Sequence, residues 1–152
     1  MNNDLMMKIT ALMPMKTIMV RGEPYLERYF VGVKNGVQDW LHRFLSSDSE
    51  EHLHSHPWDA DSTIICGWYD EEQDLSSGGT VTRMLVAGDT NYIFDGSLHR
   101  IIDAGPNTWT HMTVYPGREP TWFFIDADGN KKVMESSPVD WYLDCKPRGI
   151  AC

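Results

Sequence analysis

Short runs of apolar, β-branched and aromatic residues alternate with turn-forming residues along most of the chain, from about residue 16 to about residue 135. The Asn35-Gly36 pair between two of these runs is a strong hairpin signal, because both residues tolerate a positive φ. Many short strands separated by turns are typical of an all-β sandwich or barrel. The pattern predicts strands over residues 17–20, 25–33, 37–45, 61–69, 80–86, 91–94, 99–102, 108–115, 121–125 and 131–134.

The two ends of the chain have a different pattern. Residues 2–13 carry apolar side chains at helical spacing and are followed by Pro14, which predicts a short N-terminal helix. Residues 136–152 contain two prolines and Gly149, which predicts an irregular C-terminal tail on the outside of the barrel. Because 152 residues without an evident linker or repeat suit one compact core, we expect a single domain, residues 1–152, with its barrel over about 16–135.

Charge and composition narrow the function classes. The chain has 22 acidic and 13 basic residues, a formal net charge of -9, which disfavours binding to nucleic acids and to anionic membranes. No apolar run approaches the roughly 20 residues that span a bilayer, and the N-terminal residues lack a secretory-signal pattern. Three cysteines do not suggest a disulfide framework. These features predict a soluble cytoplasmic protein with a small-molecule partner.

The candidate chemistry is concentrated in residues 52–61. His52, His54 and His56 stand at alternate positions, so an extended strand would project all three imidazoles to one face. Imidazole is the commonest metal ligand near neutral pH, and the carboxylates of Asp59 and Asp61 follow at once. A solvated cluster of surface histidines would give the same local pattern, so these residues alone leave both interpretations open.

Two segments resemble the two sequence motifs of the cupins. They are His54-Ser55-His56 with Asp61 and Gly67, and Gly88 and Gly96 with His99. A cupin usually has glutamate where this chain has Asp61, and Asp59 is the alternative carboxylate. The second motif lacks its usual proline.

The chain is more specifically similar to small uncharacterised cupin-like proteins of bacteria and phages, over roughly residues 25–129. The segments that carry this likeness are Leu41-His42-Arg43-Phe44, His54-Ser55-His56-Pro57-Trp58, Gly67-Trp68-Tyr69-Asp70-Glu71, His99-Arg100-Ile101, Thr108-Trp109-Thr110 and Gly117-Arg118.

The resemblance implies a double-stranded β-helix, the cupin jelly roll, with one metal ion held inside the barrel. Its ligands would be His54, His56, Asp61 and His99. His52 could join these ligands or point at the barrel mouth. Three neutral imidazoles and a carboxylate suit a divalent metal, Fe(II) first, with Mn, Ni or Zn as alternatives. Such a set leaves coordination positions for a substrate, water or dioxygen.

Four further residues are candidates for roles around the metal. Glu71 could serve as a catalytic acid or base, although a solvated acidic hairpin over residues 70–74 is an alternative interpretation. Arg43 and Arg118 could each bind a carboxylate or phosphate with two parallel hydrogen bonds. With Tyr69, these arginines form the expected substrate-binding set.

Three functions fit these expectations. The first is an Fe(II)-dependent oxygenase, a dioxygenase type of oxidoreductase, acting on a small polar molecule. The second is a redox-neutral isomerase or lyase in which the metal acts as a Lewis acid. The third is a non-enzymatic module that binds a small molecule or a partner protein. Cupins often form homodimers through edge strands, and residues 17–20 are the candidate edge here.

Overall fold

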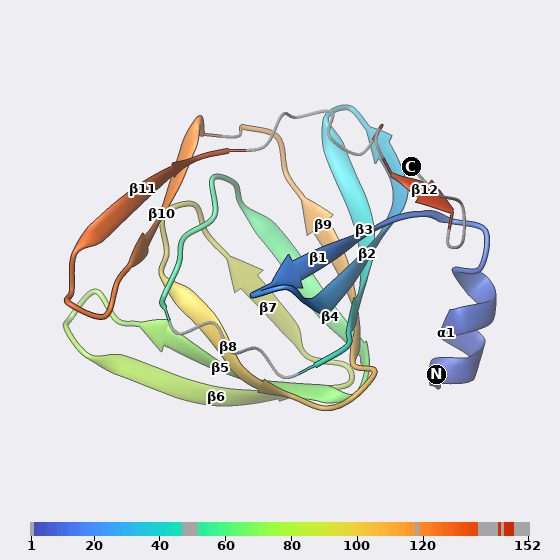
Figure 1. The fold of residues 1–152 in the computed structure, drawn as a ribbon, viewed down its shortest axis with the longest axis horizontal. Coiled ribbons are helices and arrows are strands. Elements are labelled where there is room, and N and C mark those ends of the chain that lie inside the picture. The colour runs from blue at the N-terminus through green and yellow to red at the C-terminus, as the bar shows by residue number, and fades with distance from the viewer. Residues whose placement is uncertain (1, 47–51, 118, 137–142, 144, 148–152) are drawn as a thin grey trace.

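The computed structural model describes residues 2–46, 52–117, 119–136, 143 and 145–147. These residues form an almost entirely β structure with one short helix, so the predicted all-β class is confirmed (Figure 1). The elements are α1 (Asn3–Ile9), β1 (Pro14–Val20), β2 (Glu23–Lys34), β3 (Val37–Phe44), β4 (Ala60–Cys66), β5 (Trp68–Asp74), β6 (Thr80–Val86), β7 (Thr90–Ile93), β8 (His99–Ala104), β9 (Trp109–Val114), β10 (Thr121–Ile125), β11 (Lys131–Glu135) and β12 (Lys146–Pro147).

The strands form two facing sheets and a separate hairpin. The larger sheet has seven strands in the order β12-β1-β2-β3-β9-β4-β7, and the smaller has three in the order β6-β5-β8. Figure 1 shows β5, β6 and β8 along one side of an interior that the larger sheet encloses on the other, with the β10–β11 hairpin at one end. The strand pairs in the described part of the chain are all antiparallel. The arrangement is the jelly roll that the cupin resemblance implied.

Alternation along the strands decides which side chains reach the interior. In β3, Gln38, Trp40, His42 and Phe44 are buried, whereas the residues between them are only partly buried. Successive side chains on a strand point to opposite faces of the sheet, so these four residues belong to the interior face. The core that they join consists mainly of large aromatic and aliphatic side chains contributed by both sheets.

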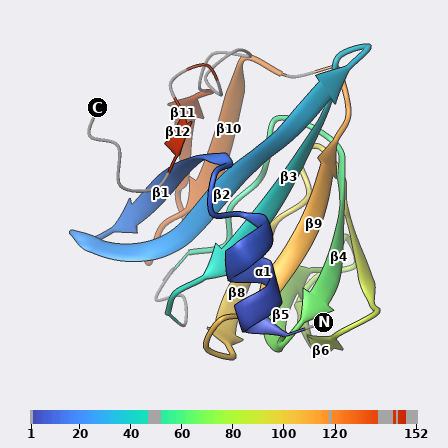
Figure 2. The ribbon, with the colours of Figure 1, turned by 90° about the vertical axis from the view of Figure 1, so that its right-hand side faces the viewer.

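Helix α1 packs on the outside of the larger sheet. The Asn2 side chain caps the helix by accepting a hydrogen bond from the Leu5 N–H at 3.0 Å. The buried Met6 packs against Tyr29 and Trp109, and Figure 2 shows α1 lying across β2, β3 and β9. The helix is shorter than the predicted 2–13, because residues 11–13 turn the chain and β1 begins at Pro14. None of the described helical structure has the length and hydropathy that a membrane-spanning helix needs.

The strand predicted over residues 61–69 is two strands, β4 and β5, which belong to different sheets. The chain turns between them at Gly67, where φ is +86°. A Cβ at this position would lie 2.3 Å from the Thr108 Oγ1, so only glycine fits. The break carries Tyr69 and Glu71 to the smaller sheet, and residues 70–74 form part of β5 and not a solvated hairpin loop.

The histidine segment is also not the continuous strand that the alternation predicted. Over residues 52–59, only His54 forms β bridges, one with His99 and one with Phe124. The segment therefore crosses between the start of β8 and the β10–β11 hairpin. Most of the predicted C-terminal tail lies outside the described residues, but residues 146–147 form β12 against the start of β1.

Candidate metal centre

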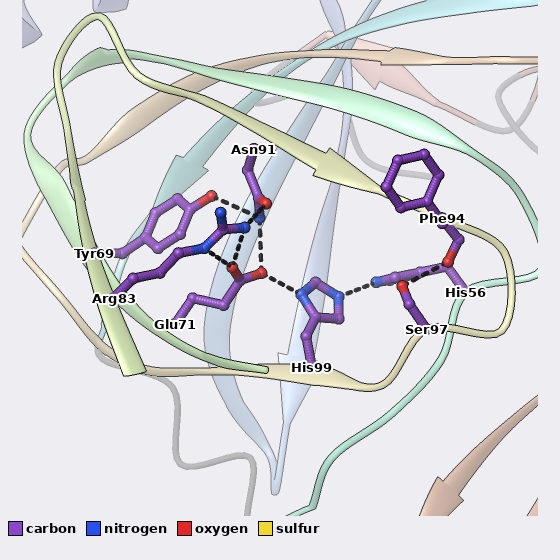
Figure 3. Close-up of polar contacts among 8 residues, drawn as sticks. All are labelled: His56, Tyr69, Glu71, Arg83, Asn91, Phe94, Ser97 and His99. Carbon is purple, nitrogen blue, oxygen red and sulfur yellow. Dashed lines mark hydrogen bonds and ion pairs between the residues drawn. The ribbon is translucent and has the colours of Figure 1, made fainter. Parts of the chain in front are cut away.

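Three histidine side chains converge inside the barrel, as the two motifs implied. The backbone brings them together: the His54 N–H donates to the His99 carbonyl at 2.9 Å, and the His99 N–H donates to the His54 carbonyl at 3.0 Å. Each of His54, His56 and His99 offers one ring nitrogen, and the three nitrogens lie within 4.8 Å of one another. The His56 and His99 Nε2 atoms are 2.9 Å apart, which Figure 3 shows as a dashed line.

A buried carboxylate contacts the ring nitrogen of His99 that does not face His56. The Glu71 side chain is only 1% exposed, and its Oε1 lies 2.5 Å from the His99 Nδ1. The same oxygen accepts a hydrogen bond from the Asn91 Nδ2 at 2.7 Å. Oε2 accepts two from Arg83, from Nε at 2.9 Å and from Nη2 at 2.8 Å. The dashed lines in Figure 3 follow this chain of contacts from Arg83 through Glu71 and His99 to His56.

The Glu71 carboxylate is in its charged form, and this sets the tautomer of His99. Burial pushes the Glu71 pKa upward, but the hydrogen bonds from His99, Asn91 and Arg83 outweigh it and leave the pKa below its usual value. A carboxylate accepts but does not donate, so the His99 Nδ1 carries the proton. The Nε2 of a neutral His99 ring then presents its lone pair to the space shared with His56, as a metal-ligating histidine does.

The pKa of His56 is well below its usual value, first because the ring is buried and second because His99 and His54 lie beside it. A neutral imidazole is the form that binds a metal.

The spacing of the nitrogens also suits an ion. Two nitrogens at about 2.1 Å from one ion and about 90° apart would lie about 3.0 Å from each other. The observed 2.9 Å between the His56 and His99 Nε2 atoms matches this arrangement. The three-histidine group therefore fits a divalent metal ion and leaves further coordination positions open.

The histidines face a pocket of about 400 Å³ in the barrel interior. Its lining is largely aromatic and aliphatic, including Tyr25, Phe44, Trp58 and Trp122. Polar side chains are placed among them, which is the usual composition of a small-molecule site. The wall opposite the histidines comes from strands β1, β2, β3 and β9 of the larger sheet. These strands contribute Lys16, Arg28, Gln38, His42 and Thr110.

The expected fourth ligand, Asp61, lies on the other face of its strand. Along β4, Ala60, Ser62 and Ile64 are buried and Ser62 lines the pocket, so the intervening Asp61 points outward. Its carboxylate accepts a hydrogen bond from the Tyr115 hydroxyl at 2.6 Å. The alternative carboxylate, Asp59, is exposed and accepts from the Asp95 N–H at 2.7 Å. Among the described residues, neither carboxylate belongs to the three-histidine group.

The substrate-binding set is only partly brought to the pocket. Tyr69 lines it, and burial, with the nearby charge of Glu71, raises the pKa of this tyrosine to about 12. Arg43 lies on the outer face of β3, where its guanidinium donates to the Asn107 side chain and to Glu27. The strand alternation that buries His42 and Phe44 turns Arg43 away from the pocket. Arg118 lies outside the described residues.

The structure also changes the interpretation of Glu71 and His52. Glu71 contacts the His99 ring but does not itself line the pocket, a position that favours orienting His99 over acting on a substrate as a catalytic acid or base. His52 stacks on Phe124, with ring centroids 5.4 Å apart, and is not in the three-histidine group.

Sequence reasoning did not find Arg83, Asn91 or Arg28. Arg83 and Asn91 come from β6 and β7, and they meet Glu71 only because three strands converge there. Arg28 carried a usable signal, because it alternates with Leu26 and Phe30 along β2 and a charged residue in an otherwise apolar inward row is unusual.

Comparisons with known proteins place the fold. No family model matches the sequence, and no curated protein matches it. Among solved structures, HEPD of Streptomyces albus, with 2-hydroxyethylphosphonate and Fe(II) bound, superposes with a TM-score of 0.58 at 13% identity, over 90% of this chain and 28% of that one. An RmlC-like cupin from Shewanella frigidimarina gives 0.54 at 20% identity, over 70% and 86%. KdgF from Halomonas gives 0.53 at 16% identity, over 68% and 88%.

An Fe(II)-bound HppE in complex with an alternative substrate is also similar, with a TM-score of 0.54 at 10% identity. The matched region covers 68% of this chain but only about half, 55%, of HppE. At such low identities these likenesses show a shared fold and carry no activity over to this chain. The chain has the cupin fold, with three histidines of its two motifs gathered at one point inside the barrel.

Proposed function

We propose that this protein is a mononuclear metal-dependent enzyme, and specifically an Fe(II)-dependent oxygenase that acts on a small polar molecule. The observation that carries the proposal is the convergence of three imidazole nitrogens within 4.8 Å of one another at the wall of a pocket of about 400 Å³. Fe(II)-bound HppE and HEPD, which share the fold, support iron as the metal.

Each residue of the site would have a distinct role. His54, His56 and His99 would hold the ion, and Fe(II) bound there would supply the redox chemistry that dioxygen requires. Glu71 keeps the proton of His99 on Nδ1 and so keeps Nε2 available. Tyr69, with a pKa of about 12, stays protonated and offers a neutral hydroxyl to the pocket. The aromatic lining excludes water from the bound substrate.

A redox-neutral reaction, such as an isomerase or lyase step, is the second candidate. It is favoured by the absence of a carboxylate from the three-histidine group among the described residues, since three histidines and one open position are also a ligand set of catalytic zinc. In that case the metal would act as a Lewis acid, and a change of oxidation state would not be needed.

Metal analysis of protein made without a histidine tag tests the site. We expect about one equivalent of a divalent metal in the native protein and a large loss in His56→Ala. His111→Ala is the matched control, because this histidine is 43% exposed on the outer face of β9 and contacts Asp39. Equal metal content in the two variants would refute the metal site.

Reactivity then separates the two candidates. An oxygenase loaded with Fe(II) should take up dioxygen when a substrate from a panel of small polar molecules is added, and the Zn(II)-loaded protein should not. Turnover that survives replacement of iron by zinc would favour the redox-neutral reaction, because zinc does not change oxidation state.

A further inference from the structure

The pocket wall opposite the histidines carries a row of polar side chains on neighbouring strands. Strand pairing places Lys16 of β1 opposite Arg28 of β2, Arg28 opposite His42 of β3, and His42 opposite Thr110 of β9. Directly paired residues lie on the same face of a sheet. All four residues line the pocket, so the row runs across its wall and not across the outer surface.

Arg28 is held in place within this row. Its Nε donates to the His42 Nε2 at 3.0 Å, and its guanidinium carbon lies 4.9 Å from the centroid of the Trp40 ring. His42 is 7% exposed, and its pKa is well below the usual value, first because of burial and then because of the Arg28 charge. A neutral His42 accepts the hydrogen bond without adding a charge, so this contact orients the guanidinium and leaves its positive charge intact.

The described residues that line the pocket differ in charge from the protein as a whole. The chain carries a formal net charge of -9. Among the described residues that line the pocket, however, the permanently charged side chains are Lys16 and Arg28, and no aspartate or glutamate is present. Lys16 is exposed and Arg28 is partly buried, which places one cation nearer solvent and the other deeper in the wall. Low-dielectric walls strengthen the field of such cations inside a cavity.

We propose that this pocket binds a small oxyanion, a carboxylate or a phosphonate, whose anionic group contacts Arg28 and Lys16 while the rest of the molecule faces the three histidines. A guanidinium presents its N–H donors in a planar fork that matches the oxygens of such groups, and the bond from the Arg28 Nε to His42 fixes the orientation of this fork. A pocket of about 400 Å³ has the size of a small-molecule site. The inference names the substrate class of the proposed enzyme, and it rests on that proposed function.

Calorimetric titration with three simple probes tests the proposal. Propionate and ethylphosphonate represent the two kinds of oxyanion, and propionamide is the neutral counterpart of propionate with nearly the same shape. Each is titrated into the Zn(II)-loaded and the metal-free protein. We expect at least one oxyanion to bind about tenfold or more tightly than propionamide, because hydrogen bonds to charged groups are the stronger ones. The preference between propionate and ethylphosphonate identifies the kind of substrate.

Substitutions of Arg28 and Lys16 show how much each side chain contributes to oxyanion binding. Arg28→Gln should weaken oxyanion binding about tenfold or more, and Lys16→Gln should weaken it less because Lys16 is more exposed. Arg43→Gln is the matched control, an arginine on the next strand that faces outward to Asn107 and Glu27, and it should bind oxyanions as the native protein does. If Arg28→Gln does not fold, Arg28→Lys replaces it, and we expect an intermediate loss because lysine keeps the charge without the planar fork.

Failure of this inference differs from failure of the proposed function. Equal affinity for propionate and propionamide, equal binding by the Arg28 and Arg43 variants, or no binding of either oxyanion would overturn the inference, even in protein that holds its metal. Oxyanion binding that depends on Arg28 in protein unable to hold a metal would support the inference and overturn the proposed enzyme.

Discussion

Replacing Glu71 by glutamine tests the site most directly, because the change keeps the shape of the side chain and removes its charge. Glu71 accepts four hydrogen bonds, from His99, Asn91 and twice from Arg83. A glutamine has one acceptor oxygen and a donor NH₂ group, so at least one neighbouring N–H would face another donor. The variant would no longer hold the proton of His99 on Nδ1 against a negative charge.

Two magnitudes follow from these contacts. Loss of the carboxylate behind a metal-ligating histidine typically costs about 10- to 100-fold in metal affinity. The loss of hydrogen bonds to a charged group costs about 1.5–3 kcal/mol of stability each. The glutamine loses at least one of these bonds, and because the Arg83 side chain is 40% exposed and water can solvate it, we expect a cost of about 2 kcal/mol.

Two measurements separate these effects. Competition with a chelating dye gives the metal affinity, and urea unfolding of the metal-free protein gives the stability. Glu72→Gln is the matched control, because Glu72 is adjacent in β5 but pairs with Arg100 outside the pocket. Metal affinity that is the same in Glu71→Gln and Glu72→Gln would refute the role of Glu71 in positioning His99.

Three further predictions concern the fold and the charges around the site. Gly67→Ala should destabilise the protein by about 3 kcal/mol or more in urea unfolding, because its Cβ would overlap Thr108 at a φ of +86°. Gly88→Ala is the control: its φ is +101° but no atom lies within 4 Å of the added Cβ, so it should cost only about 1–2 kcal/mol. Equal costs of the two substitutions would contradict the overlap with Thr108. Asp61→Asn should leave metal affinity unchanged, because this side chain points outward, and a tenfold loss in the dye assay would restore it as a ligand. Because the pKa of His42 is lowered in the folded protein, His42 of the unfolded chain is protonated first as the pH falls. Stability should therefore fall as pH drops below about 6.5, by up to about 1.4 kcal/mol per pH unit. His42→Gln should show a shallower fall between pH 7.5 and pH 5.5 in urea unfolding, and an unchanged slope would contradict the lowered pKa of His42.

The hydrophobic pattern of the chain correctly predicts the class of fold and most strand positions. Alternating apolar runs separated by turns predict strands because the requirement for one buried face acts locally. The Asn35-Gly36 hairpin is confirmed, with φ values of +53° and +81°. The resemblance to the two cupin motifs selected His54, His56 and His99, and these three side chains do meet at one point. The local pattern was sufficient to predict strands, because the alternation of buried and exposed residues is set within each strand.

The other residues around the three histidines could not be predicted, because their positions depend on how the strands and sheets pack. Asp61 and Ser62 are neighbours in sequence, but the pleat of β4 turns one outward and the other to the pocket. Glu71 changed from a residue of an acidic segment to a buried partner of His99, because the turn at Gly67 transfers the chain to the opposite sheet. Arg28 alternates with Leu26 and Phe30 along β2, but the packing of the two sheets decides that this face of the strand lines the pocket. A sequence pattern shows which residues can carry chemistry, whereas the packing of the sheets decides which of them share one cavity.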